Sequence, residues 1–326
     1  RAHGVGLLLG PALNIKRSPL CGRNFEYYSE DPLLAGRMAA AFTRGIQSRG
    51  VGACLKHFAL NNMETRRQNS DSVCDMRTMR EIYLAAFETA VRDAAPWSVM
   101  CSYNRINGTF ASDNAWLLTT VLRDEWGFDG LVMTDWGALN DRIAAVQAGT
   151  ELEMPASDGR TDRALVEAVE TGLLDEAVLD RAVGRVLRVV FRAGEALRTL
   201  PEAPVDPAAN HRFARRTAAE CMVLLKNVKN LLPLASGRRV AVIGPFARVP
   251  RTQGGGSSHV PSWSVDVPLD ELRTCFPDAA YARGCGAEDA ADEVDGTELE
   301  EAVRTAREAD VAVLFLGLPD RIESEG

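Results

Sequence analysis

The first 195 residues alternate short apolar runs with segments of helical periodicity, and this alternation restricts the fold more than any other feature. Near-continuous apolar runs, each followed by a helix, are typical of buried parallel strands covered by helices. The five runs are VGLLLG, VGACLKHFAL, WSVMCSYN, GLVMTDWG and ELEMP. A complete (β/α)8 barrel needs about 250 residues. We therefore predict an α/β fold with most of a TIM-type barrel, incomplete at its N-terminus.

Two of the predicted helices can be placed in more detail. The stretch SDNAWLLTTVLRDEWG offers Ser112 and Asp113 as N-cap candidates and Gly127 as the residue that ends the helix. In the segment after the second run, apolar residues recur at spacings that stack on one helix face. These residues are Met79, Ile82, Tyr83, Ala86, Phe87, Ala90 and Val91.

The chain divides at a proline-rich stretch. RTLPEAPVDPAANH holds three prolines and is typical of a linker. A second pattern of strands and helices follows, beginning with RRVAVIGP and ending with DVAVLFLGLP. We predict a partial barrel over residues 1–195, a linker over 196–213 and a second α/β domain over 214–326, which ends too early to close its sheet.

Composition excludes several functional classes. Acidic residues outnumber basic ones 45 to 37, giving a net charge of -8 without a basic stripe, so nucleic acid is not an expected partner. No apolar run is long enough to cross a bilayer. The seven cysteines form no C-x-x-C pair, which favours free thiols and a reducing compartment such as the cytoplasm. His3, His211 and His259 lack metal-ligand spacing, so neither a metal nor a cofactor is predicted.

Polar and aromatic side chains stand where three of the predicted strands end. In barrel enzymes that end of the strands builds the active site. A carboxylate, hydrogen-bonding groups and aromatic rings at one mouth suit a polyhydroxylated ring. Each residue alone also has an ordinary explanation, as a helix cap, a solvated side chain or part of the core. The residues are Lys56 with His57, Tyr103 with Asn104, and Asp135 with Trp136.

Two reaction classes fit these residues. Glycoside hydrolysis usually needs two carboxyl groups, one as nucleophile or base and one as general acid. An aldolase-like reaction would instead use Lys56 to form a Schiff base. The residues alone leave both open.

Motifs in order along nearly the whole chain resemble glycoside hydrolase family 3, and closely its β-glucosidases. The resemblance implies a barrel followed by an αβα sandwich, with a retaining, exo-acting glycosidase site between the two. The motifs are GPALNIKRSPLCGRNFEYYSEDP, GVGACLKHFALNNMETRR, SYNRINGTFASDN, LRDEWGFDGLVMTDWGA, ELEMP, VLLKN, VAVIGP, GGGSS and ESEG.

The resemblance also implies roles for individual residues. Asp135 matches the catalytic nucleophile, which forms a covalent glycosyl-enzyme. Glu325 matches the general acid/base, and Glu323 is the weaker candidate. Trp136 would flank the sugar. Cationic neighbours would hold Asp135 ionised, whereas Glu325 needs a raised pKa to stay protonated at the start of the cycle. The residues implied to hold the sugar hydroxyls are Arg23, Lys56, His57 and Tyr103.

The resemblance implies a small carbohydrate substrate, and departures from other branches favour the branch with a glutamate as the acid/base. The N-acetylglucosaminidase branch carries a catalytic histidine after KHFPGHG, whereas here KHF continues as ALNNMETRR. The NNMET continuation favours a β-glucosidase over a β-xylosidase. A β-xylosidase, another exo-β-glycosidase of the family, a noncatalytic sugar-binding fragment and a homo-oligomer all stay open.

Two further expectations concern the ends of the chain and a glycine-rich stretch. An early sugar-binding aspartate of the family, in a DGP-like motif, would precede Arg1, and the sandwich would continue beyond Glu325. We therefore expect these 326 residues alone to fold poorly and turn over little. GGGSS, residues 254–258, matches neither common phosphate-loop pattern, and we interpret it as a mobile loop near the domain interface.

Overall fold

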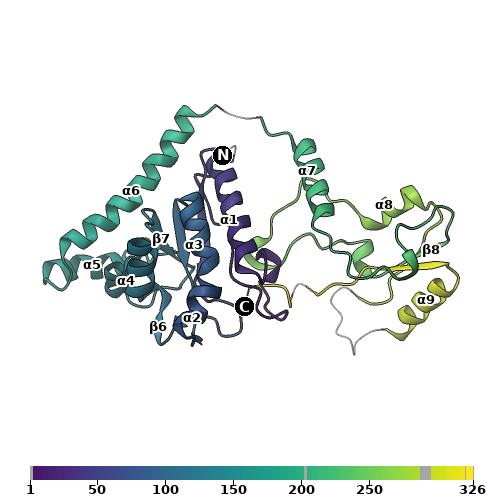
Figure 1. Ribbon diagram of the computed structural model, residues 1–326. Coiled ribbons are helices and arrows are strands. Elements are labelled where there is room, and N and C mark those ends of the chain that lie inside the picture. The colour runs from purple at the N-terminus through teal and green to yellow at the C-terminus, as the bar shows by residue number, and fades with distance from the viewer. Residues whose placement is uncertain (1–2, 202–203, 287–294, 320, 326) are drawn as a thin grey trace. The chain divides into compact units, whose positions relative to one another are not determined.

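The computed structural model describes residues 3–201, 204–286, 295–319 and 321–325. The chain divides into two compact units, Arg1–Ala203 and Pro204–Glu325. Each unit is described by itself below, and the helices of both are labelled in Figure 1.

A four-stranded, all-parallel sheet forms the centre of the first unit, in the order β1-β2-β4-β7. Its strands fall in the first four predicted runs. The fifth run contributes an isolated parallel bridge, between Met133 and Leu152. Beyond it, the Met154 N–H donates to the Thr134 hydroxyl at 2.8 Å rather than to a strand carbonyl. The strands are β1 (Leu7–Leu8), β2 (Gly52–Phe58), β4 (Ser98–Cys101) and β7 (Leu131–Thr134).

Helices follow the strands of this sheet, as the alternation predicts. The α-helices of the first unit are α1 (Pro32–Gln47), α2 (Met76–Thr78), α3 (Ala85–Ala94), α4 (Arg142–Ala148), α5 (Arg160–Glu170) and α6 (Glu176–Thr199). Shorter or wider helical segments are η1 (Asn24–Glu26), η2 (Met79–Tyr83), η3 (Ala111–Asp113) and η4 (Trp116–Glu125). A small separate sheet joins β3 (Asp71–Ser72), β5 (Arg105–Ile106) and β6 (Thr109–Phe110).

The main core lies between the sheet and the helices that cover it. Leu55 and Val132 of the strands pack in one cluster with Phe87 of α3 and Leu118 of η4, all buried. Helices α1 and α3 run side by side (Figure 1), and Asp31 caps α1 by accepting a hydrogen bond from the Leu33 N–H. This packing fixes the strands whose ends carry the polar residues.

One residue of the helix face predicted over residues 79–91 points outward. Ile82 is 39% exposed, whereas Met79 and Phe87 are buried. The reason is that η2 is a π-helical turn, in which the Leu84 N–H donates to the Met79 carbonyl at 2.9 Å. The extra residue per turn rotates Ile82 off the buried face.

The predicted cap of the next helix was also wrong. Ser112 and Asp113 belong to η3, and Asn114 makes the cap by accepting from the Leu117 N–H at 3.0 Å. The end of the segment matches the prediction, because Gly127 takes a φ of +74°, which favours glycine.

The second unit holds a three-stranded parallel sheet in the order β10-β8-β9. Its core includes Val240, Val242 and Leu269. The strands are β8 (Val240–Ile243), β9 (Ala280–Ala282) and β10 (Val311–Leu314). The helices are α7 (Pro207–Glu220), α8 (Pro268–Cys275) and α9 (Gly296–Arg307), with short turns η5 (Val228–Asn230), η6 (Pro245–Ala247) and η7 (Gly256–Ser258).

The segment predicted as a linker, 196–213, is helical at both of its ends. Helix α6 continues to Thr199, and α7 begins at Pro207. Asp206 caps α7 through the Ala209 N–H, and proline is well suited to the first helical position. The prolines therefore mark a helix start as well as a break.

The structure also shows the state of the cysteines and the character of the helices, which the composition was used to predict. All seven cysteines are free thiols, of which Cys21, Cys54 and Cys101 are buried. Within the described ranges, no helix combines the length and the apolar character that crossing a membrane requires.

Candidate active site

The polar residues predicted from the strand ends lie at one edge of the parallel sheet. Lys56 and His57 come from the last residues of β2, Tyr103 follows β4, and Asp135 and Trp136 follow β7. Because the strands are parallel, their carboxyl ends meet at the same edge, although the register between β2 and β4 shifts between Leu55 and Phe58.

Asp135 is the central carboxylate of this edge. It is only 7% exposed, and its Oδ1 accepts a hydrogen bond from the Trp136 N–H at 2.7 Å. Its Oδ2 faces two nitrogens, His57 Nε2 at 3.5 Å and Arg23 Nη1 at 4.0 Å. Oδ2 has no hydrogen-bond donor within bonding distance among the described residues. A carboxylate oxygen without a donor keeps its lone pairs available for attack on a substrate.

Burial and the neighbouring polar groups shift the pKa of Asp135 in opposite directions. Burial is the largest influence and raises the pKa of Asp135 above its ordinary value. The Trp136 N–H, Arg23, the Tyr103 hydroxyl and Lys56 each lower that pKa. Burial outweighs them, so the cationic neighbours limit the increase rather than reverse it.

His57 is a buried, neutral imidazole. Burial is the main cause that places the pKa of His57 well below its usual range, and Arg23, Lys56 and Arg67 add to this effect. A neutral ring presents an N–H to Asp135 only in the tautomer protonated at Nε2. Nδ1 makes no hydrogen bond within the described part of the chain.

Asn14 fixes the backbone that carries His57, and sequence reasoning missed it. Its side-chain amide donates to the His57 carbonyl at 2.8 Å, and its carbonyl oxygen accepts from the His57 N–H at 2.7 Å. Asn14 is itself buried. The two residues are 43 positions apart, so no local pattern reveals the pair.

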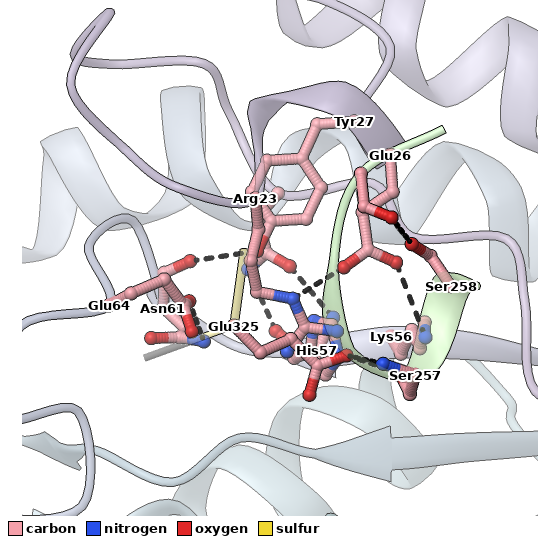
Figure 2. A network of polar contacts seen from close by, with 12 residues as sticks. Arg23, Glu26, Tyr27, Lys56, His57, Asn61, Glu64, Ser257, Ser258 and Glu325 are labelled. Atoms are coloured by element: carbon pink, nitrogen blue, oxygen red, sulfur yellow. Dashed lines mark hydrogen bonds and ion pairs between the residues drawn. The ribbon is translucent and has the colours of Figure 1, made fainter. Parts of the chain in front are cut away.

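Glu26 is a second carboxylate of this site that sequence reasoning missed. It forms an ion pair with the Nε of Arg23, and its Oε2 lies 3.3 Å from the Nζ of Lys56 (Figure 2). The i, i+3 spacing of Arg23 and Glu26 on a helical turn is the one signal that could have found it. Glu26 therefore contacts Arg23 and Lys56, the two cationic residues predicted to bind sugar hydroxyls.

Tyr103 responds to the charge of Asp135 and packs against a further ion pair. The guanidinium of Arg67 lies 4.3 Å from the centre of the Tyr103 ring, and Arg67 Nη1 lies 2.6 Å from Glu64 Oε2. Burial, followed by the negative charge of Asp135, raises the pKa of Tyr103, so its hydroxyl stays protonated and can donate. Trp136, in contrast, is 43% exposed.

The two acidic residues of ESEG belong to the second unit. The Oε1 of Glu325 accepts hydrogen bonds from the hydroxyl and from the N–H of Ser257 (Figure 2). Glu323 instead lies with its carboxylate 3.7 Å from Arg251. No cluster of potential metal ligands occurs among the residues that the structure describes.

Comparisons with known proteins identify both units. Residues 1–189 match the glycosyl hydrolase family 3 N terminal domain, and residues 222–326 match the glycosyl hydrolase family 3 C-terminal domain. Thermostable beta-glucosidase B of Acetivibrio thermocellus is 51% identical, over 100% of this chain and 43% of that protein. An exo-alpha-(1->6)-L-arabinopyranosidase of Bifidobacterium longum is 48% identical, over 99% of this chain and 43% of its own length.

Solved structures agree with these matches. The family 3 β-glucosidase of Bifidobacterium adolescentis is 47% identical with a TM-score of 0.91, covering 98% of this chain and 47% of that one. β-Glucosidase 3B of Thermotoga neapolitana in complex with glucose is 34% identical with a TM-score of 0.85, covering 99% and 48%. The chain thus spans less than half the length of these relatives. Its fold combines the barrel-type N-terminal domain with the C-terminal domain, and the chain belongs to glycosyl hydrolase family 3.

Proposed function

We propose that this chain carries the catalytic residues of a retaining, exo-acting β-glucosidase that removes terminal β-D-glucosyl residues. One observation carries the proposal: a buried aspartate at the end of β7 turns an oxygen toward His57 and Arg23. The names of several relatives, β-glucosidases among them, support the choice of sugar.

In the proposed cycle, Asp135 is the nucleophile and Glu325 the general acid/base. Asp135 attacks the anomeric carbon while Glu325 protonates the departing glycosidic oxygen, so one C–O bond forms as the other breaks. In the second step a water molecule attacks the anomeric carbon and displaces Asp135. As it attacks, the water gives one proton to the Glu325 carboxylate, which restores the starting state of the enzyme. Retention requires the two carboxyl groups to come within about 5 to 5.5 Å of each other.

The sugar hydroxyls are proposed to bind the groups around Asp135. Lys56 and Arg23 supply charged donors, and neutral His57 and protonated Tyr103 supply uncharged ones. The exposed ring of Trp136 offers an apolar face for the sugar. Donors that strengthen their hydrogen bonds as the ring becomes cationic would lower the barrier by several kcal/mol.

The nucleophile is tested by trapping. A 2-fluoro-glucoside with an activated leaving group should leave a 2-fluoroglucosyl adduct on the peptide that contains Asp135, detected by mass spectrometry. Asp135→Asn should abolish the adduct, whereas Asp129→Asn should keep it, because Asp129 is an exposed acid that pairs with Arg188. An adduct on another residue would refute the assignment of Asp135.

A second substrate is favoured by the arabinopyranosidase relative. α-L-Arabinopyranosides differ from β-glucosides in an axial 4-hydroxyl and in lacking the hydroxymethyl group at C5. β-Xylosides differ from β-glucosides only in lacking that hydroxymethyl group. The preferred sugar is identified by comparing kcat/KM for the 4-nitrophenyl β-glucoside, α-L-arabinopyranoside and β-xyloside. Sugar binding without turnover of any of them would favour a noncatalytic fragment.

A further inference from the structure

The stretch GGGSS, residues 254–258, which we call the GGGSS loop, is held together by its own hydrogen bonds. The Ser258 hydroxyl donates to the carbonyls of Gly254 at 2.8 Å and Gly255 at 3.1 Å. Just outside the loop, the Gln253 side chain donates to and accepts from the backbone of Val260, at 2.9 and 3.0 Å. The loop therefore has a defined shape rather than that of a simple flexible connection.

The GGGSS loop contacts the segment that carries Glu325 at two points. The Ser257 hydroxyl donates to Glu325 Oε1, and the Ser257 N–H donates to the same oxygen at 3.3 Å (Figure 2). Two residues earlier in each segment, the Gly255 N–H donates to the Glu323 carbonyl at 2.9 Å. One contact fixes the backbone near Glu325, and the other fixes its carboxyl group.

Gly256 shows that the loop is shaped around this side chain. Its φ is +74°, a conformation that L side chains rarely adopt. A Cβ placed there would lie 3.2 to 3.3 Å from the Cβ, Cγ and Cδ atoms of Glu325. Both the backbone conformation and the close approach of Glu325 therefore favour glycine at this position.

We propose that the GGGSS loop positions Glu325 for proton transfer, with Ser257 as the positioning residue. This inference rests on the proposed role of Glu325 as general acid/base. Because both donors of Ser257 point at Oε1, the proton that Glu325 delivers belongs on Oε2. Holding one oxygen by two donors fixes the carboxyl plane and so aims the other oxygen at the leaving group.

The test uses the enzyme expressed from its complete coding sequence and a series of aryl β-glucosides. A good leaving group such as 2,4-dinitrophenolate departs without protonation, whereas phenol needs the acid. Ser257→Ala should lower kcat/KM for phenyl β-glucoside about tenfold or more and hardly change that for the dinitrophenyl substrate. Ser257→Thr, which keeps a hydroxyl, should recover most of the loss, and Gly256→Ala should behave like Ser257→Ala.

Two comparison variants separate the possible outcomes. Gln253→Ala removes the brace through Val260 and should affect all aryl glucosides equally. Glu325→Gln should show the strongest leaving-group dependence. If it does and Ser257→Ala lowers all substrates equally, or none, the positioning role is wrong. If Glu325→Gln shows no such dependence, Glu325 is not the acid and the inference fails with it, while labelling of Asp135 still tests the nucleophile independently.

Discussion

Glu26 sets how much uncompensated positive charge surrounds Asp135. Its carboxylate pairs with Arg23 and lies 3.3 Å from the Nζ of Lys56. Arg23 in turn lies 4.0 Å from Asp135. Removing the charge of Glu26 takes the negative partner away from Arg23 and Lys56, so both cations act on Asp135 more fully.

Glu26→Gln is therefore expected to change both substrate binding and pH dependence. Asp135 must be ionised to attack, so kcat/KM falls as the pH drops through its raised pKa. In the variant that acid limb should move to lower pH. KM should rise about tenfold, because Arg23 and Lys56 lose a charged partner. The measurement is a pH profile of kcat and KM on an aryl β-glucoside.

The other titratable groups around Asp135 are not expected to titrate with it: His57 is neutral, Tyr103 stays protonated, and Arg67 is paired with Glu64. Glu30→Gln removes the same charge from an exposed position and should move neither KM nor the acid limb. A rise in KM with an unmoved acid limb would show that Glu26 only supports the structure.

The residues at the strand ends were predictable, and their supporting partners were not. Asp135 and its neighbours follow apolar runs whose period is visible in sequence. Asn14 comes from a loop and Glu26 from the short helical turn η1, and their partners in β2 lie 43 and 30 positions away in the chain. Contacts of this range depend on the tertiary fold, which no local pattern encodes.

At the scale of elements, the close packing of α1 on α3 depends on Gly36. A Cβ at this position would lie 2.8 Å from the Thr89 Cβ and 3.1 Å from the Ala86 carbonyl oxygen. Gly36→Ala should destabilise the protein by about 1–3 kcal/mol, because the two helices must move apart. Gly45→Ala in the same helix has open space and should stabilise it by about 0.5–1 kcal/mol. Urea midpoints measure both, and equal signs would contradict the argument.

Glu151 ties three elements of the first unit together. Its carboxylate accepts from the Val132 N–H of β7 at 2.7 Å and pairs with Arg123 of η4 and Arg185 of α6. Glu151→Ala should cost about 3–5 kcal/mol, because it leaves Arg123 buried without its carboxylate. The exposed pair Arg77 and Glu81 is the control, and Glu81→Ala should change stability by less than about 1 kcal/mol. Similar urea midpoints for the two variants would contradict this view.

Element types were predictable from periodicity, but their local distortions were not. The π-turn η2 inserts one residue into a pattern that is otherwise regular, which exposes Ile82. Likewise, Asn114 caps η4 although Ser112 and Asp113 are equally good capping types. In both cases tertiary packing selects among local conformations that the sequence allows.

For the whole molecule, the sequence pattern indicated two units, because one series of strands and helices ends at the proline-rich stretch and another begins after it. The structure divides between Ala203 and Pro204, within that stretch. The extent of helix at that boundary was not predictable, because Pro207 suits a helix start as well as a linker. The two carboxyl groups proposed for catalysis belong to different units, so only the chemistry assigns them to one cycle.

That assignment predicts that the losses caused by the two substitutions are not multiplied. When two groups act in the same catalytic cycle, removing the nucleophile stops the reaction, so the acid/base has no remaining step to accelerate. With phenyl β-glucoside, Asp135→Asn and Glu325→Gln should each lower kcat/KM by at least about a hundredfold. The double variant should retain the same residual rate as Asp135→Asn alone. Losses that multiply would mean that the two carboxyl groups act independently, and Glu325 would then lose its place as the acid that serves Asp135.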